Sequence, residues 1–199
     1  MKIDKIINEL CLSNTYILTL NDTTIIVDPG SNYSELEKFI TDNNLNVIAV
    51  LLTHGHFDHC YSAYEFEKKG IPIYVSHFDK DKVLKDGDIN LFFKHDFTSC
   101  KLVNTYDNEY LNLENFNIKV IETPGHTKGC VSLLIDGNLF SGDFVFKSGI
   151  GRYDLYDSDV SMVISSLRKI AKLDDNIIVY PGHGDATTIG DLKKYLNLK

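Results

Sequence analysis

The sequence lacks the features of a disulfide-stabilised or membrane-spanning protein. Its four cysteines are widely spaced among 199 residues, without the CxxC pairs or dense framework of small secreted proteins. It has no apolar run of about 18 residues, the length that a transmembrane helix needs. The opening MKIDKIINEL contains no apolar stretch of signal-peptide length. We therefore expect reduced thiols, no membrane partner and a cytoplasmic location.

Positive charge is also scarce. Lys and Arg number 20 against 28 Asp and Glu, which gives a formal net charge of -8. Binding to nucleic acid is driven by clustered Lys and Arg, so no nucleic-acid partner is predicted. The sequence also has no internal repeat, low-complexity tract or Pro/Ser-rich linker. A chain of this length buries enough surface for one core, and a single domain over residues 1–199 is expected.

Short apolar segments alternate with helical patterns. Predicted strands cover residues 15–20, 23–28, 47–52, 71–75, 116–123, 130–136, 138–143 and 176–180. Predicted helices cover 34–42, 59–69, 159–171 and the C-terminal residues, the first opened by a Ser34/Glu37 capping box. This order predicts an α/β protein in which helices cover stacked sheets.

One loop concentrates side chains that bind metals. The stretch THGHFDHC, residues 53–60, holds three histidines and an aspartate directly after the apolar run 47–52. Five of the seven histidines of the chain follow predicted strands in Gly-containing loops. Strand ends fix the positions of such loops, and glycines allow the backbone to turn until the imidazoles converge. A shared metal site is therefore predicted.

The spacing of these groups indicates two sites that share one carboxylate. The predicted ligands are His54, His56 and His126 for the first metal, Asp58, His59 and His183 for the second, and Asp143 for both. Imidazole and carboxylate ligands without thiolate suit zinc, and also iron or manganese. Two divalent metal ions, with zinc favoured, are the expected cofactors.

Two divalent cations facing only two anionic ligands, Asp58 and Asp143, leave a net positive centre. Such a centre lowers the pKa of bound water to about 7, so that hydroxide becomes available as a nucleophile. The metals can also polarise a carbonyl group and stabilise its oxyanion. The pattern predicts hydrolysis at neutral pH, with Asp58 and Asp143 as catalytic residues through the metals that they bind.

The ordered motifs THGHFDH, TPGHT, SGD and PGHG resemble those of metallo-β-lactamase fold hydrolases of the glyoxalase II-like branch. The resemblance extends from the NTYILTL segment to PGHG. It implies a four-layer αββα sandwich with the metal site along one edge, and it implies the same seven ligands. It also implies an anionic hydroxyacyl thioester substrate of the S-lactoylglutathione type.

The segment FKSGIGRYDL resembles the place where glyoxalase II-like proteins turn a Gly-Arg or Gly-Lys pair towards the substrate's carboxylate. Arg152 is therefore the candidate anion-binding residue, with a surface arginine as the alternative. Tyr153 is a candidate for packing against the thiol carrier. Two-domain glyoxalase II enzymes add a helical domain, whereas 16 residues follow His183 here. The chain resembles the short single-domain type, for which the thiol carrier is open.

Two other activities remain open. A mononuclear iron persulfide dioxygenase shares the HxHxDH motif and a GRxD loop like Gly151–Asp154, and would place one iron at His54 or His56 with His126 and Asp143. A lactonase or another ester hydrolase of the same fold ranks third. A nuclease ranks lower because the chain is acidic. The sequence does not indicate an oligomeric state.

The remaining polar groups have structural interpretations. Free cysteines commonly behave as small buried hydrophobic residues, and all four are predicted to pack in this way. Two histidines, His77 and His95, are predicted to face solvent. The acidic run has no EF-hand spacing and is interpreted as a solvated face formed by Asp79, Asp81, Asp86 and Asp88.

Overall fold

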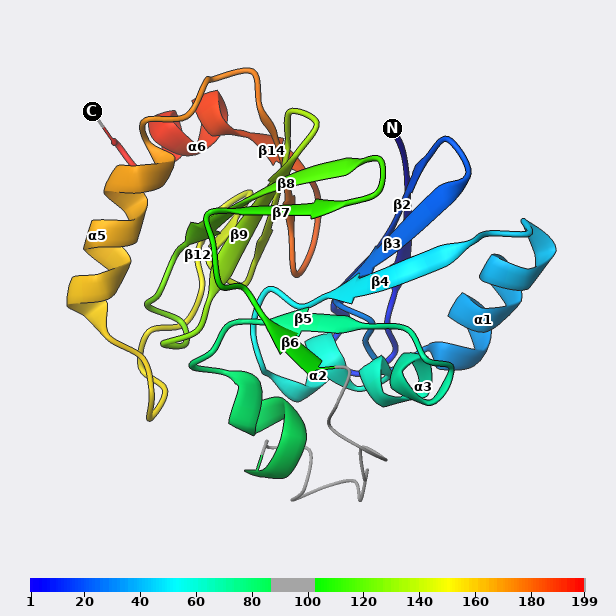
Figure 1. The fold of residues 1–199 in the computed structure, drawn as a ribbon. Coiled ribbons are helices and arrows are strands. Elements are labelled where there is room, and N and C mark those ends of the chain that lie inside the picture. The colour runs from blue at the N-terminus through cyan, green and yellow to red at the C-terminus, as the bar shows by residue number, and fades with distance from the viewer. Residues whose placement is uncertain (87–102, 199) are drawn as a thin grey trace.

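The computed structural model describes residues 1–86 and 103–198, and two six-stranded sheets dominate that part of the chain (Figure 1). The strands of the first sheet are, in spatial order, β1 (Lys2–Ile7), β2 (Asn14–Leu20), β3 (Thr23–Val27), β4 (Val47–Leu51), β5 (Ile73–Val75) and β6 (Val103–Thr105). Strands β1 to β3 pair antiparallel, whereas β3 to β6 pair parallel.

The second sheet is mostly antiparallel. Its strands are, in spatial order, β14 (Thr187–Thr188), β13 (Ile178–Pro181), β10 (Asn138–Gly142), β9 (Val131–Ile135), β8 (Phe116–Glu122) and β7 (Tyr110–Leu113). Strands β10 and β13 pair parallel. A two-stranded ribbon of β11 (Val145–Phe146) and β12 (Gly149–Ile150) follows β10 in the chain.

Helices lie on the outer side of each sheet (Figure 1). Those beside the first sheet are α1 (Tyr33–Asp42), α2 (Phe57–Cys60) and α3 (Ala63–Lys68), and those beside the second are α5 (Val160–Ile170) and α6 (Ile189–Tyr195). One π-helical turn spans Lys82–Asp86. The resulting layers are helix, sheet, sheet and helix, which confirms the predicted αββα sandwich.

Three buried clusters hold these layers together. One packs α1 and α3 on the first sheet, a second fills the space between the sheets, and a third packs α5 and α6 on the second sheet. Strand β4 shows why its sequence is continuously apolar: Val50 packs towards the helices and Leu51 between the sheets, and both are fully buried. The continuously apolar run 47–52 is typical of a strand covered on both faces, and β4 is such a strand.

Two helix predictions need correction. Helix α1 has Asn32 as its N-cap, so Ser34 lies inside the helix and the predicted capping box is absent. The helix predicted over 59–69 is interrupted between α2 and α3. The reason for the break is Ser62, whose backbone N–H donates to the carbonyl of Pro29 and whose hydroxyl donates to that of Gly30. Both bonds tie the segment to the end of β3.

The polar groups outside the site motifs also differ in part from the prediction. Asp79 is fully buried, so its assignment to a solvated face is wrong, whereas Asp81 is exposed as predicted. Among the cysteines, Cys60 and Cys130 are buried as expected, but Cys11 is exposed because it lies in the turn between β1 and β2, where its φ is 59°. His77 faces solvent as predicted. Beyond the described part lie the predictions for Cys100, His95, Asp88 and the side chain of Asp86.

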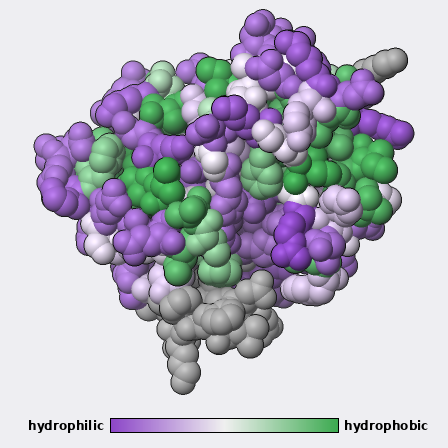
Figure 2. Space-filling view, turned by 180° about the vertical axis from the view of Figure 1, so that it is seen from behind, coloured by the Kyte–Doolittle hydropathy of each residue, from purple (hydrophilic) through white to green (hydrophobic). Residues whose placement is uncertain are grey.

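Hydrophobic and hydrophilic residues are interspersed over the face seen from behind (Figure 2). Large apolar side chains that stay exposed include Leu12, Phe78 and Tyr156. Within residues 1–86 and 103–198, every helix is too short or too polar to cross a membrane.

The aromatic residues between the sheets should dominate stability. Phe140 is 1% exposed, and its ring lies 5.3 Å from that of Tyr16 and 5.2 Å from that of Tyr180. We expect Phe140→Ala to lower the free energy of unfolding by about 3–5 kcal/mol, measured by urea denaturation. Phe78→Ala, at a 65% exposed position, is the matched control and should change it by about 0.5 kcal/mol or less. Equal losses in the two variants would contradict this core assignment.

Candidate metal centre

Strand ends bring the predicted ligands together. His54 and His56 follow β4 of the first sheet. In the second sheet, β8, β10 and β13 run in the same direction, so the loops that follow them share one edge. Those loops carry His126, Asp143 and His183. The site therefore forms where the two sheets meet along that edge.

The first predicted group closes as expected. His54 Nε2 lies 3.1 Å from His56 Nδ1, which lies 2.9 Å from His126 Nε2. Two nitrogens bound to one tetrahedral zinc at about 2.0–2.1 Å are about 3.3 Å apart. The three ring nitrogens therefore lie close enough to one another to share a single ion.

The second predicted group closes in the same way. Asp58 Oδ2 lies 3.3 Å from His183 Nε2 and 3.5 Å from His59 Nε2. The Nε2 atoms of His59 and His183 are 3.3 Å apart. One carboxylate oxygen and two imidazole nitrogens therefore face a common point.

Asp143 lies between the two groups. Its Oδ2 is 3.6 Å from His126 Nε2 and 3.4 Å from His183 Nε2, and its Oδ1 is 3.3 Å from His59 Nε2. One carboxylate thus reaches a member of the first group and two members of the second. This position matches the shared role predicted from the sequence.

The outer ring nitrogens of three histidines have partners that orient the rings. His54 Nδ1 lies 3.1 Å from the Thr53 hydroxyl, and His126 Nδ1 donates to the backbone carbonyl of Arg152 at 2.7 Å. His59 Nδ1 lies 3.1 Å from Asp28 Oδ2. Such partners fix the tautomer that turns the other nitrogen towards a metal.

The sequence pattern did not reveal a role for Asp28, the last residue of the predicted strand 23–28. It forms a further cluster with His54 and His59 that could hold an ion. However, its oxygens already accept from the backbone N–H of Thr53 at 2.7 Å and from the Thr53 hydroxyl at 2.6 Å. With His59 as a third partner, Asp28 is better suited to orient His59 than to bind a metal.

The loop of His183 is held by the start of β2, a contact that the sequence pattern did not reveal. The side-chain amide of Asn14 donates to the carbonyls of Pro181 and Gly184, each at 2.9 Å. The Tyr16 hydroxyl donates to the Pro181 carbonyl at 2.6 Å. These bonds cross from the first sheet to the second and set the position of His183.

Two features of the structure fit bound cations. Asp143 Oδ1 is buried without a partner in hydrogen-bond geometry among the described residues. A Cβ atom at Gly182 would lie 2.2 Å from that oxygen and 2.7 Å from His59 Cε1, and one at Gly151 would lie 1.7 Å from the Asp143 carbonyl oxygen. Gly182 leaves room at the Asp143 carboxylate and Gly151 beside the Asp143 backbone carbonyl. The nitrogen and oxygen donors suit divalent metal ions.

Two imidazoles of the first group, those of His54 and His56, are neutral at pH 7. Burial lowers the pKa of His54 well below its usual value. Burial and the neighbouring His126 lower the pKa of His56 to about 4. These two imidazoles have free lone pairs at neutral pH and can accept a metal without losing a proton.

The second group carries both signs of charge. Burial opposes protonation of His59 and His183, but nearby carboxylates, above all Asp143, raise the pKa of His59 well above its usual value and that of His183 to about 9. Burial likewise opposes ionisation of Asp58 and Asp143, but the same imidazoles lower both carboxyl pKa values. Without metal, this group is an imidazolium–carboxylate cluster.

Arg152 and Tyr153 lie on the loop that passes the centre. The Arg152 carbonyl holds His126, but its guanidinium points outward, is 69% exposed and donates to Asp154 at 3.0 and 3.2 Å. Tyr153 is 48% exposed. The structure therefore places the backbone of this loop at the centre and both predicted substrate side chains at its surface.

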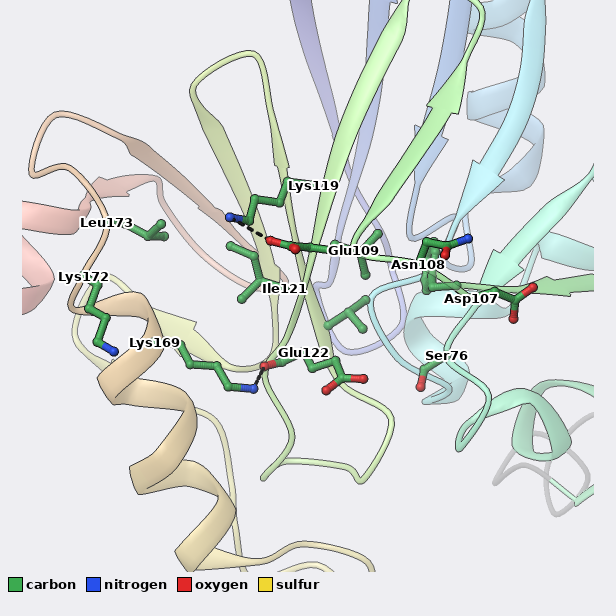
Figure 3. Close-up of a pocket in the computed structure, with 13 residues that line it drawn as sticks. Ser76, Asp107, Asn108, Glu109, Lys119, Ile121, Glu122, Lys169, Lys172 and Leu173 are labelled. Atoms are coloured by element: carbon green, nitrogen blue, oxygen red, sulfur yellow. Dashed lines mark hydrogen bonds and ion pairs between the residues drawn. The ribbon is translucent and has the colours of Figure 1, made fainter.

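A cavity of about 600 Å³ lies elsewhere, beside β8 and the end of α5 (Figure 3). It is lined by residues of both signs: Lys119 Nζ lies 3.0 Å from Glu109 Oε1, and Lys169 donates to the carbonyl of Glu122. The described lining includes none of the seven candidate ligands. The metal centre, not this cavity, is the candidate active site.

The comparisons agree with this architecture. The model of the metallo-beta-lactamase superfamily matches residues 8–183. Hydroxyacylglutathione hydrolase GloC of Haemophilus influenzae is 34% identical over 87% of each chain. The probable metallo-hydrolase YqgX of Bacillus subtilis is 33% identical over 93% of this chain and 92% of the relative. The chain therefore belongs to the metallo-β-lactamase superfamily and is a metal-dependent hydrolase of that class.

Solved structures show the same fold. BLEG-1 B3 metallo-beta-lactamase superposes with a TM-score of 0.85 at 29% identity, covering 97% of both chains. TTHA1623 in a di-iron-bound form gives a TM-score of 0.82 at 27% identity over 96% of both chains. ETHE1 from Myxococcus xanthus covers 98% of this chain and 83% of its own at a TM-score of 0.78, but its 23% identity supports the fold alone.

The protonated imidazoles of the second group predict proton release on metal binding. Ligands must be deprotonated to bind, and His183, with a pKa raised to about 9, holds a proton at pH 7. We expect zinc to displace protons at pH 7 and to displace fewer as the pH rises through the pKa of His183, about 9. Calorimetry in buffers of different ionisation enthalpy measures this release.

The exposed His77 provides the control, because His77→Gln should leave the number of released protons unchanged. Binding of zinc at pH 7 without any proton release would contradict the charge assignment of the second group.

Proposed function

We propose that this protein hydrolyses hydroxyacyl thioesters of the S-lactoylglutathione type, using two divalent metal ions held by His54, His56, His126, Asp58, His59, His183 and Asp143. Zinc is the favoured metal, with iron or manganese as alternatives. The observation that carries the proposal is the convergence of two imidazole–carboxylate groups on one shared carboxylate. The name of the GloC relative supports the substrate class.

The metal ions, when bound, supply water that is ionised near neutral pH and polarise the carbonyl of the substrate. The chain contributes geometry and charge. Asp143 presents an oxygen to each group, while Asp28 and the Arg152 carbonyl hold His59 and His126 in place. Because these ligands are mostly buried, little water competes for them and little reorganisation is needed during the reaction.

A thioester suits such a site because its leaving group needs little help. A thiolate is a far better leaving group than an amine, so the reaction requires no separate strong acid. An anionic substrate also suits the surface of the site, where Arg152 is exposed beside the centre. We infer that Arg152 binds the carboxylate of the substrate after it exchanges Asp154 for that group, and that Tyr153 packs against the thiol carrier.

A mononuclear iron persulfide dioxygenase is the second candidate. The similarity to ETHE1 supports only the fold of that enzyme. The second group favours the hydrolase, since Asp58, His59 and His183 converge and a mononuclear site would leave them without an ion. A lactonase stays third, because lactones also present an activated carbonyl. The cytoplasmic location, the absence of nucleic-acid and membrane partners, and the single-domain organisation remain predictions.

The decisive assay is steady-state hydrolysis of lactoyl thioesters by zinc-loaded protein, followed by release of the thiol. We expect turnover, and we expect Asp143→Ala to lower kcat/KM by more than about 100-fold, the upper end of losses for outer partners of metal ligands. Asp81→Ala, which removes an exposed carboxylate, should retain the native rate.

Parallel measurements separate the candidates. About two zinc ions per chain support the hydrolase, whereas about one iron with oxygen uptake on glutathione persulfide supports the dioxygenase. Lactone and β-lactam substrates complete the set. Absence of turnover with every thioester, while one of the others is consumed, would exclude the proposed activity.

Arg152→Ala tests recognition of the substrate. We expect KM for anionic thioesters to rise by about two- to fivefold with little change in kcat, a small effect because solvent screens an exposed guanidinium. A neutral thioester should show no such rise. Arg168→Ala, at an exposed position on α5, is the matched control. An unchanged KM for anionic thioesters would leave Arg152 with its backbone role alone.

A further inference from the structure

A buried carboxylate outside the candidate ligands accepts three hydrogen bonds. Asp79 follows β5 and is 0% exposed. Its Oδ2 accepts from the backbone N–H of Gly55 at 3.0 Å and from the hydroxyl of Thr127 at 2.6 Å. Its Oδ1 accepts from the backbone N–H of Gly129 at 3.2 Å. Burying a carboxylate is costly unless such donors surround it, so these donors hold Asp79 in one place.

The donors belong to the two loops that carry the first metal group. Gly55 lies between His54 and His56, and Thr127 directly follows His126. One loop follows β4 of the first sheet, and the other follows β8 of the second. Asp79 therefore connects the two halves of a group that different sheets supply.

Both loops approach Asp79 closely because glycine stands at each contact. A Cβ atom at Gly129 would lie 2.4 Å from Asp79 Cγ, and one at Gly55 would lie 3.1 Å from the Asp79 carbonyl oxygen. A larger residue at Gly129 would displace the carboxylate. The close fit shows that the position of Asp79 is specified by the backbone of both loops.

Lys82 balances the charge of Asp79 and extends the network. Its Nζ lies 3.2 Å from Asp79 Oδ1 and also contacts Asp157. Burial would lower the pKa of Lys82, but the hydrogen bond to Asp157 and the charge of Asp79 raise it. Next to Asp157, the Ser158 hydroxyl donates to the His126 carbonyl at 2.8 Å. The network thus returns to the first group.

The second group has different support. Asp28 contacts His59, and Asn14 holds the loop of His183. The hydrogen bonds and ion pairs described for Asp79 include none with Asp58, His59 or His183. Loss of Asp79 should therefore affect the two groups unequally.

We propose that Asp79 is a positioning residue that sets the separation of His54 and His56 from His126, and thereby the metal affinity of the first group. This inference rests on the proposed metal centre but not on the identity of the substrate. Asp79 acts through the backbone of Gly55 and through Thr127, without touching the metal.

Asp79→Asn tests the proposal because it keeps the size of the side chain but replaces one acceptor oxygen by an NH₂ donor. We expect the zinc dissociation constant of the first group to rise by about 10- to 100-fold, as for other outer partners of metal ligands. That of the second group should stay within about twofold. Competition with a chromophoric chelator measures both steps in the whole chain, and His126→Ala and His183→Ala assign each step to its group.

Asp81→Asn is the matched control, since it makes the same change two residues away at an exposed position. Native affinity at the first group of Asp79→Asn, or an equal loss at both groups, would overturn the proposal while leaving the proposed function intact. Native protein that binds no zinc would overturn both.

A second variant decides the case if Asp79→Asn does not fold. Thr127→Val removes the hydroxyl that donates to Asp79 but keeps the shape of the threonine side chain. Thr127→Ser retains the hydroxyl. A selective loss of first-group affinity in Thr127→Val that Thr127→Ser restores supports the proposal. Equal affinities in the two Thr127 variants would overturn it.

Discussion

The centre depends on the close contacts of Gly142 with Gly182 and Thr53 at the edge of the sandwich. Gly142 ends β10 with a positive φ of 50°, at a shift in register between β10 and β13. The Gly142 carbonyl accepts a hydrogen bond from the N–H of Gly182 at 2.8 Å. A Cβ atom at Gly142 would lie 2.2 Å from Thr53 Oγ1. The loops with His54, Asp143 and His183 can meet only because these backbones approach so closely.

Charge divides the centre into two parts that a single carboxylate joins. The first group consists of imidazoles, and burial keeps His54 and His56 neutral. The second combines His59 and His183 with Asp58, and in the absence of metal its opposite charges stabilise one another. Asp143 contacts both parts, so its protonation state is coupled to the charge of each.

The sequence was most informative where chemistry and periodicity coincide. Ligands such as His126 follow apolar strands in glycine-containing loops, and α5 has a regular apolar stripe, so both were predictable. Asp28 and Asp79 were not, because a buried aspartate looks like a surface aspartate until its backbone donors are known. The break in the helix at Ser62 has the same origin, since its partner carbonyls lie more than 30 residues away in the chain.

In the loop at Arg152, the backbone and the side chains have different roles. Its backbone packs against the centre: Gly151 has no space for a side chain beside Asp143, and the Arg152 carbonyl accepts a hydrogen bond from His126. The side chains of Arg152 and Tyr153 instead extend into solvent. Replacing an exposed side chain leaves the carbonyl in place, so this surface can change without disturbing the candidate ligands. One fold can thus keep its metal site while the side chains of its surface loops vary.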